Sequence, residues 1–297
     1  MPLWTPSPVF QSGTALVAQL PDSAATGGNT RGANATDWQT SRSAATMVAS
    51  GQFSTIGGGN ANTASGQGAT VGGGQNNVAS GANATIGGGG NGNTASGATS
   101  TIGGGASNTA SGISATVAGG STNGGNGQLS WCPGGQQAAA RGLFGLGFWS
   151  AGQFASGGDA QAEEHMLRRS TTDATATRLT ANNGVAGTSN TINLANFSAI
   201  AGRLIVRARA DGGVNLSASW FLDISATRDN GAGTVLIEGG GGTAITPTHS
   251  RGLGSAWRID VTADTTNGGI AVTVTGAAAT TINWVARFVA VQVATAS

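Results

Sequence analysis

Residues 93–120 read NTASGATSTIGGGASNTASGISATVAGG, and this stretch decides the fold. Nearly all of it is Gly, Ala, Ser, Thr or Asn, which is the composition of a flexible linker. Within it, however, Ile102 and Val117 stand in the same local context, each directly after a threonine. A β-branched residue that stays in phase among small residues indicates a repeated structural unit.

The same unit occurs five times, and two rows of residues show its period. The β-branched residues before the glycine clusters are separated by 15, 15, 16 and 15 positions: Ile56, Val71, Ile86, Ile102 and Val117. The asparagines that follow are separated by 15, 16, 15 and 15 positions: Asn62, Asn77, Asn93, Asn108 and Asn123. The one extra residue therefore falls within GGGGNG, residues 87–92. An insertion confined to a glycine turn is typical of a folded repeat, whereas a flexible segment would repeat only by chance.

Each unit predicts one coil of a β-solenoid. In ATV (69–71) and ATI (84–86), Ala and the β-branched residue share one face of a short strand. The GGG cluster provides a bend where side chains would clash or φ must be positive. Burial in one coil contributes roughly 3 to 4 kcal/mol, whereas ordering fifteen residues costs roughly 15 to 25 kcal/mol. We therefore expect the five β-branched residues to pack against the same residues of other chains, as the core of a homotrimer.

Composition excludes several classes of function. The 297-residue chain has a formal net charge of +1 and no lysine, so we expect neither a nucleic-acid partner nor a P-loop or lysine-dependent chemistry. Cys132 is the only cysteine, which excludes an intrachain disulfide and a four-cysteine zinc site and predicts a small buried residue. We expect no cofactor and no metal.

Targeting signals are also missing from the sequence. No run approaches 18 apolar residues, and the first residues, MPLWTPSPVF, have no basic segment. We therefore expect no membrane insertion and no signal peptide, and we expect the protein to be assembled in a host cytoplasm.

The C-terminal part predicts longer strands with alternating side chains, separated by glycine-rich turns. These strands are RLIVRAR (203–209), SWFLDISAT (219–227), WRIDVTAD (257–264), GIAVTVTG (269–276) and TINWVARFVAVQV (281–293). They indicate a β-sandwich. Its last strand is apolar on both faces, which suggests that it also faces a neighbouring chain. The following charged residues are interpreted as cross-strand ion pairs: Arg207, Arg209, Asp223, Arg258 and Asp260.

Four segments are therefore predicted. They are an N-terminal virion-attachment segment (1–50), a solenoid shaft (51–127), a neck (128–162) and a β-sandwich tip (163–297). The neck holds aromatic residues that would fill a change in diameter or, alternatively, form a carbohydrate-binding platform: Trp131, Phe144, Phe148, Trp149 and Phe154.

The motif NTASGxxATVGGG resembles the head repeats of trimeric autotransporter adhesins and the same repeat in bacteriophage tail fibres. The segments at 31–51, 156–184 and 255–293 resemble segments of phage fibre and tail proteins. Autotransporters carry a signal peptide and a C-terminal membrane anchor, which we do not expect here, so the phage family is favoured. This resemblance implies a homotrimeric fibre or spike on the virion tail that attaches to a host glycan or protein. It transfers no catalytic residues.

Two glycine-containing loops, 227–233 and 238–252, are the candidates for receptor binding. Their polar residues Asp229, Asn230, His249 and Arg251 are the predicted contacts, with plain surface loops as the alternative.

Candidate chemistry is sparse. Asp159, Glu163 and Glu164 lie close together as a glycosidase pair would, but AEEHMLRR (162–169) is interpreted as a polar turn with local charge pairing. His165 and His249 are too far apart in sequence to indicate a metal site. The row Thr55, Thr70, Thr85, Thr101 and Thr116 has Gly or Ala two residues after each threonine, which does not match the paired threonines of an ice-binding surface. We therefore expect a structural protein that is not an enzyme.

Three other functions stay open at this point. A head fibre or decoration protein would have the same sequence features. A polysaccharide-degrading tailspike would need a carboxylate pair in a cleft. A bacterial surface adhesin would need an anchor supplied elsewhere.

Overall fold

The computed structural model describes residues 10–12, 15–17, 20, 22–24, 27–212, 216–252 and 256–295. The chain divides into two compact units, of which the first ends at Gln136 and the second begins at Gln137. Strands and turns build both units, and the described residues contain no α-helix, which confirms the predicted all-β class. Among these residues there is accordingly no helix with the length and hydropathy of a membrane span.

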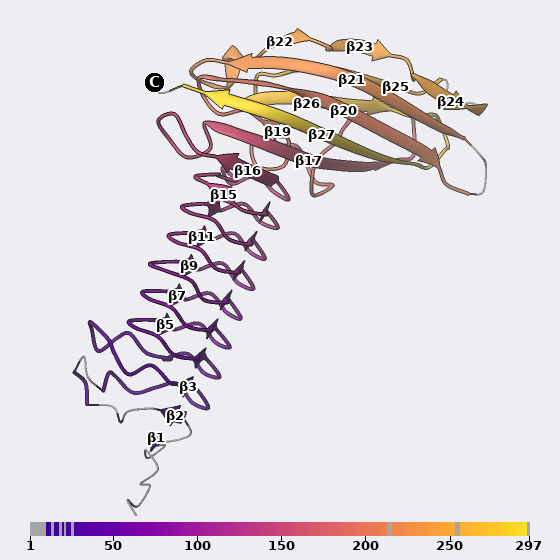
Figure 1. Ribbon diagram of the computed structural model, residues 1–297. Helices are drawn as coiled ribbons and strands as arrows, with labels where there is room; N and C mark the ends of the chain where they lie inside the picture. Colours follow the sequence, from indigo (N-terminus) through magenta and orange to yellow (C-terminus); the bar gives the residue numbers. More distant parts are fainter. Residues whose placement is uncertain are drawn as a thin grey trace, which may run out of the picture. The chain divides into compact units, whose positions relative to one another are not determined.

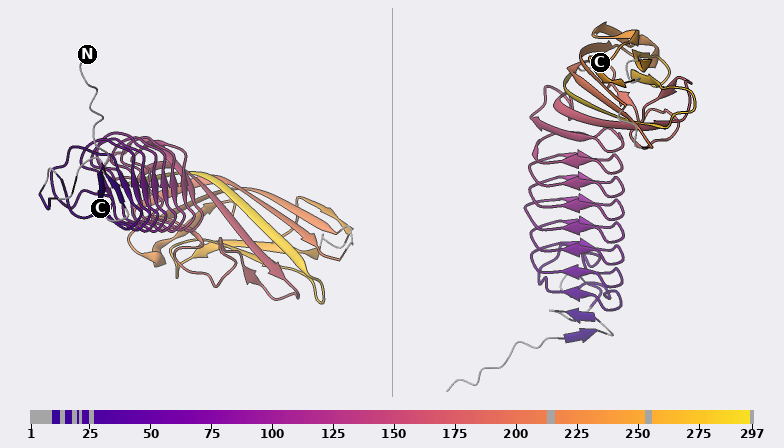
Figure 2. Two further views of the ribbon diagram at one scale, coloured as in Figure 1. Left: turned by 90° about the horizontal axis from the view of Figure 1, so that it is seen from below. Right: turned by 90° about the vertical axis from the view of Figure 1, so that its right-hand side faces the viewer.

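The first unit is a β-solenoid whose coils each add short strands to two parallel sheets (Figure 1). In the first sheet the strands stack in register, as the right-hand view of Figure 2 shows. Its strands are β3 (Thr36–Asp37), β4 (Thr55–Ile56), β6 (Thr70–Val71), β8 (Thr85–Ile86), β10 (Thr101–Ile102), β12 (Thr116–Val117) and β14 (Trp131–Cys132). The second sheet contains β5 (Thr63–Ala64), β7 (Val78–Ala79), β9 (Thr94–Ala95), β11 (Thr109–Ala110) and β13 (Gly124–Gly125). The other strands of this unit are β1 (Phe10–Ser12), β2 (Ala15–Val17) and β15 (Gly135–Gln136).

The β-branched residues of the repeat are buried inside a single chain. The five residues with no exposed surface are Ile56, Val71, Ile86, Ile102 and Val117. They face the second sheet of their own coils: Gly125 occupies an alanine position there, and a Cβ on it would lie 3.2 Å from Cγ2 of Val117. Their assignment to a core shared by three chains is therefore corrected, because no surface of these side chains is left for another chain. The homotrimer itself stays a prediction.

A row of buried asparagines links successive coils. The backbone N–H of Asn123 donates to Oδ1 of Asn108 at 3.0 Å, and Nδ2 of Asn108 donates to the carbonyl oxygens of Gly104 and Gly120 at 3.1 and 3.0 Å. The same pattern recurs along the row, whose members are all buried: Asn62, Asn77, Asn93, Asn108 and Asn123. An amide supplies the acceptor and the two donors that this position needs. The asparagine period therefore records a hydrogen-bonded ladder.

The extra residue of the third repeat is absorbed by its glycine turn, as predicted. The parallel register continues across it, with Ile86 beside both Val71 and Ile102. The Nδ2 group of Asn93 bonds to the carbonyl of Gly90, three residues before it, whereas the other asparagines bond four residues back. Only the turn changes, so both sheets keep their alignment.

Glycine is required where neighbouring coils approach each other closely. A Cβ on Gly66 would lie 2.1 Å from the carbonyl oxygen of Gly81. Gly74 has φ of +88°, and a Cβ there would lie 2.0 Å from the carbonyl oxygen of Gly89. These positions confirm the two predicted reasons for glycine in the repeat. Glycine lets the backbones of neighbouring coils approach each other closely, and it adopts a positive φ.

At its N-terminal end the interior of the solenoid is polar. Asp37 occupies the β-branched position of β3, and its Oδ2 lies 2.9 Å from Nε of Arg31 and 3.3 Å from Nη2 of Arg42. All three side chains are fully buried. Gln39 replaces the asparagine of this coil, because its Oε1 accepts the backbone N–H of Asn62 at 2.8 Å. We call Arg31, Asp37, Gln39 and Arg42 the polar cap.

The coils extend beyond the predicted shaft, 51–127, in both directions. β3 pairs with β4 at one end, and β14 pairs with β12 at the other. Cys132 in β14 takes the position of Val117 and is completely buried, which confirms its prediction as a small buried residue. Burial raises the pKa of its thiol.

The second unit is a β-sandwich of two antiparallel sheets, as predicted (Figure 1). The large sheet has the order β16-β17-β27-β20-β21, and β22 and β24 both pair with β21. Its strands are β16 (Gly147–Ala151), β17 (Ala160–Thr171), β27 (Ile282–Ala294), β20 (Ser198–Ala210), β21 (Ser217–Arg228), β22 (Leu236–Gly239) and β24 (His249–Arg251). In the small sheet, β25 lies between β23 and β26, and two short strands also pair with β26. The bounds are β18 (Thr177–Arg178), β19 (Ile192–Asn193), β23 (Gly242–Ile245), β25 (Arg258–Asp264) and β26 (Gly269–Thr275), with a 3-10 helix at Ala232–Thr234.

Three tryptophans form the centre of the sandwich core. The ring of Trp284 lies 5.6 Å from that of Trp220 and 5.7 Å from that of Trp257, and all three side chains are buried. Two of their N–H groups donate inside the core, from Trp220 to the carbonyl of Ile245 and from Trp284 to Oγ1 of Thr171. A large apolar core with satisfied polar groups makes the sheets a rigid support.

The predicted neck, 128–162, does not form a unit of its own. Trp131 belongs to β14 in the first unit, whereas Phe148 and Trp149 belong to β16 in the second. The last strand, β27, lies in the middle of the large sheet, between β17 and β20. Its inward face is buried, but Val291 is 64% exposed on the outward face, so one chain alone does not cover both faces.

Candidate functional site

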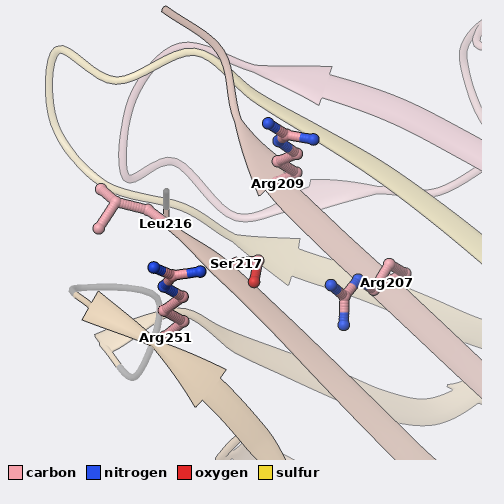
Figure 3. Close-up of a pocket in the computed structure, with 5 residues that line it drawn as sticks. All are labelled: Arg207, Arg209, Leu216, Ser217 and Arg251. Carbon is pink, nitrogen blue, oxygen red and sulfur yellow. The ribbon is translucent and has the colours of Figure 1, made fainter. Parts of the chain in front are cut away.

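The outer face of the large sheet brings three arginines together from two strands far apart in the sequence. Antiparallel pairing places Arg209 of β20 beside Ser217 of β21, and Ser217 beside Arg251 of β24. Arg207 shares the face of Arg209 because the two are separated by one residue of a strand. Together with Leu216 these residues line a pocket of about 170 Å³, which we call the arginine pocket. Figure 3 shows the guanidinium groups of Arg207 and Arg251 on either side of Ser217.

A second outward row supports this pocket. Arg207 pairs in register with Ser219, and its Nη1 donates to the Ser219 hydroxyl at 2.5 Å. Ser219 in turn pairs with His249, whose ring packs edge-on against Phe221 with 5.8 Å between centroids. One guanidinium of the pocket is thus oriented by a hydroxyl of the neighbouring strand.

The arginine pocket holds positive charge without a counterion from the described part of the chain. Its three arginines are exposed, and no described carboxylate lies within salt-bridge distance of them. Elsewhere on the same face, Arg203 pairs with Asp223 at 2.8 Å and Arg287 pairs with Glu164 at 2.7 Å. The prediction that Arg207 and Arg209 form cross-strand ion pairs is therefore wrong, because the aspartate of β21, Asp223, pairs with Arg203.

The four predicted receptor contacts do not come together. Arg251 lines the arginine pocket and His249 lies in the adjacent row, but both belong to β24, so the predicted loop 238–252 contains strands. Asp229 and Asn230 follow the opposite end of β21, about 36 Å away along a strand of this length. Asn230 there accepts a hydrogen bond from a neighbouring loop. The predicted set thus divides into one pair at the pocket and one pair remote from it.

Sequence analysis did not identify Arg207 and Arg209 as site residues. The signal was present in RLIVRAR, where three arginines, Arg203, Arg207 and Arg209, share one face of a strand. SWFLDISAT, the strand that follows, has a single carboxylate to offer them. This excess of arginine over carboxylate would have distinguished a binding face from a row of ion pairs.

The three carboxylates considered as a glycosidase pair lie in separate environments. AEEHMLRR is part of the long strand β17 and not a polar turn, so the neighbours Glu163 and Glu164 point to opposite faces. Glu164 pairs with Arg287 on the outer face, and Asp159 accepts three backbone N–H groups of its own turn. These three residues therefore do not converge on a cleft.

Glu163 belongs to a buried polar network. Arg141, His165 and Gln161 lie 2.8, 2.9 and 2.8 Å from its carboxylate oxygens. Burial alone raises the pKa of Glu163, but the charge of Arg141 and the hydrogen bonds from His165 and Gln161 lower it to about 2. His165 is thus buried in β17, while His249 is exposed in β24, and no cluster of metal-binding side chains occurs in the described ranges.

A second hollow, of about 430 Å³, lies on the same face toward the other end of the sheet. It is lined by Trp149, Phe154, Val291 and Val293, among other residues. Two aromatic residues that were considered for a carbohydrate platform are therefore exposed there, whereas Phe148 is buried.

Comparisons with known proteins find relatives only at the level of structure. No protein-family model and no curated protein matches the chain. The tailspike of Acinetobacter phage vB_ApiP_P1 matches at 13% identity and a TM-score of 0.22, over 82% of this chain and 47% of that one. The tailspike of Acinetobacter baumannii phage Fri1 matches at 8% identity and a TM-score of 0.24, over 79% and 41%. The tailspike of Acinetobacter baumannii phage AM24 matches at 10% identity and a TM-score of 0.22, over 88% and 55%.

The chain thus spans about half the length of the tailspikes that it matches. Its similarity to these phage tailspike proteins is one of low sequence identity and low TM-score. The Fri1 protein is described as a capsular polysaccharide depolymerase. That description contradicts the prediction that this protein is not an enzyme, and the prediction is corrected accordingly.

Proposed function

We propose that this chain is part of a phage tail fibre or spike and that its β-sandwich attaches the virion to a glycan of the host surface. The observation that carries this proposal is the arginine pocket. Arg207, Arg209 and Arg251 are held on rigid, paired strands, and their charge is not neutralised by any described carboxylate. An exposed, fixed charge of one sign favours capture of a ligand of the opposite sign.

Other parts of the chain have structural roles in this proposal. The solenoid serves as a shaft, and residues 1–50 fasten it to another tail protein. Three chains assemble into a homotrimer, for which the exposed Val291 and Val293 on the outer face of β27 offer an apolar surface. Native mass spectrometry tests this assembly: a trimer of 28.7 kDa chains has a mass of about 86 kDa.

Attachment is tested with fluorescently labelled full-length protein on host cells. We expect the cells to be labelled, and we expect the label to disappear from mutants that lack surface polysaccharide. Equal labelling of both strains would contradict glycan attachment. Gold-labelled antibody on virions separates the tail position proposed here from a head fibre.

The polysaccharide-degrading alternative needs its own assay. Purified protein is incubated with isolated host polysaccharide, and new reducing ends are measured over time. An increase assigns a depolymerase activity to this chain, whereas binding without new ends leaves attachment as the function.

A further inference from the structure

We propose that the arginine pocket binds a carboxylate group of an acidic sugar, with Arg207, Arg209 and Arg251 as its ligands. This inference rests on the proposed function and specifies the chemical class of the glycan. Nothing in the repeat or in the solenoid is needed for it, because all three arginines lie in β20 and β24 of the sandwich.

The spacing of the strands suits one carboxylate between the arginines. Neighbouring strands lie about 5 Å apart, so Arg209 and Arg251, with Ser217 between them, are about 10 Å apart at their Cα atoms. Arg207 and Arg209 are about 7 Å apart along β20. The three arginines line one pocket, and a forked guanidinium group can donate to both oxygens of a carboxylate, which is the geometry that arginine favours.

The other groups of the pocket suit a sugar. Ser217 is half-buried between two of the arginines and can exchange hydrogen bonds with a ring hydroxyl. Leu216 offers an apolar surface for the C–H face of a sugar ring. The pocket also opens on a sheet face, so a polymer can continue past it.

The charges around the pocket disfavour a nucleic acid. A polyphosphate chain needs a basic track that follows its backbone. Elsewhere on this face Asp223 and Glu164 are each paired with an arginine, and Arg168, two strands away from Arg207, is one further exposed arginine. The arginine pocket is a short cluster of positive charge, and the ion pairs next to it are neutral. Such an arrangement favours a ligand whose negative charges are isolated over one with a continuous row of them.

The test measures binding of the full chain to oligomers of galacturonate, glucuronate and N-acetylneuraminate by isothermal titration calorimetry. Arg207→Gln, Arg209→Gln and Arg251→Gln remove the charges one at a time. Arg258→Gln, an exposed arginine of β25 in the small sheet, is the matched control. We expect at least one acidic oligomer to bind, each pocket variant to weaken it at least tenfold, and the control to bind as the parent protein does.

Two further probes establish the chemistry. Methyl-esterified galacturonate oligomers keep the sugar and lose the charge, so we expect no binding. Sugar phosphates and single-stranded oligothymidylate present phosphate instead of carboxylate, and we expect them to bind at least tenfold more weakly than the acidic oligomer.

Several results would overturn the inference. They are the absence of binding to every acidic oligomer, equal binding of the methyl ester, tighter binding of a phosphate probe, or a loss in Arg258→Gln as large as in the pocket variants. If host polysaccharide still binds while the three pocket variants behave as the parent, only this inference fails and the proposed attachment stands. Circular dichroism of each variant excludes misfolding as the cause of a loss.

Discussion

Asn108 uses its whole side-chain amide to join its own coil to the next. Its Oδ1 accepts a backbone N–H of the next coil, and its two donors reach carbonyl groups of both coils. A coil with one β-branched residue and two alanines gains little from apolar burial. Satisfied polar groups at a buried position therefore contribute a large share of its stability, since each unpaired one is costly.

We predict that Asn108→Ala destabilises the solenoid strongly. The change removes three hydrogen bonds, a buried one to the backbone N–H of Asn123 and two part-buried ones to the carbonyl groups of Gly104 and Gly120, at about 1 kcal/mol for each. We expect the free energy of unfolding to fall by about 3 kcal/mol in urea titrations. Asn83→Gly is the control, because Asn83 is exposed and its positive φ of 55° suits glycine. Similar losses in the two variants would contradict the role of the ladder.

Glu163 makes the stability of the second unit depend on pH. Its pKa is lowered from 4.5 to about 2 in the folded protein. Because the folded value lies below the unfolded one, the ionised carboxylate stabilises the fold above pH 4.5, and this contribution is lost as the pH falls toward 2. The ionised carboxylate of Glu163 thus contributes about 3 kcal/mol to the free energy of unfolding at neutral pH.

We expect Glu163→Gln to flatten this dependence. Between pH 7 and pH 2 the variant should lose about 3 kcal/mol less of its free energy of unfolding than the parent protein does. Denaturant titrations at a series of pH values measure this. Glu164→Gln, on the opposite face of the same strand, serves as control, and a curve flattened equally by both changes would refute the assignment.

At the residue scale the sequence predicted positions better than roles. The period identified Asn108 and Val117 correctly, and the small size of Cys132 predicted its burial. The ladder was not foreseen, because its bonds join residues 15 positions apart and depend on the stacking of coils. Arg209 was misassigned because its register with Ser217 and Arg251 is set only by the folded sheet.

At the scale of elements, each coil is limited by how closely its backbone approaches the next. We predict that Gly66→Ala destabilises the solenoid by about 3 kcal/mol or more, because the new Cβ would lie 2.1 Å from the carbonyl oxygen of Gly81 and force a backbone shift. Gly73→Ala should be nearly neutral, since no atom lies within 4 Å of a Cβ there. Thermal unfolding followed by circular dichroism compares the two, and equal melting temperatures would disprove the packing argument.

Strands with alternating apolar side chains were predicted well, and irregular ones were not. The predicted segments 203–209 and 219–227 lie within β20 and β21. β17 was mistaken for a turn because its charged residues include Glu163, whose arginine partner, Arg141, comes from elsewhere in the unit. β24 was hidden behind a glycine-rich segment, and only its pairing with β21 makes it a strand.

At the scale of the whole molecule, each unit has a core of its own. We predict that the fragment 137–297 folds without the solenoid, because Trp220, Trp257 and Trp284 pack against one another inside it. Tryptophan emission should stay blue-shifted in the fragment and move to the red in denaturant. A red-shifted emission in buffer would show that the sandwich depends on the first unit.

The prediction of a homotrimer depended on an estimate of the free energy that holds one coil together. The trimer was inferred from too little apolar burial in one coil, but that estimate left out the asparagine ladder. Because Ile56 and Val71 are already buried in one chain, the proposal of three chains now rests on exposed apolar surfaces such as that of Val291. The two sheets of the sandwich, by contrast, followed from strand pattern alone.

At its N-terminal end the solenoid is covered by a strand of its own chain, β2. A stack of identical coils has no inherent length, and an uncovered end could add the end of another molecule, as growing fibrils do. With Asp37 between Arg31 and Arg42, the coil of β3 carries buried charge at the position where the next coils carry Ile or Val. Here β2 of the same chain already pairs with the outer edge of β3, and β1 pairs with β2, so this edge is not free to accept the end of another molecule.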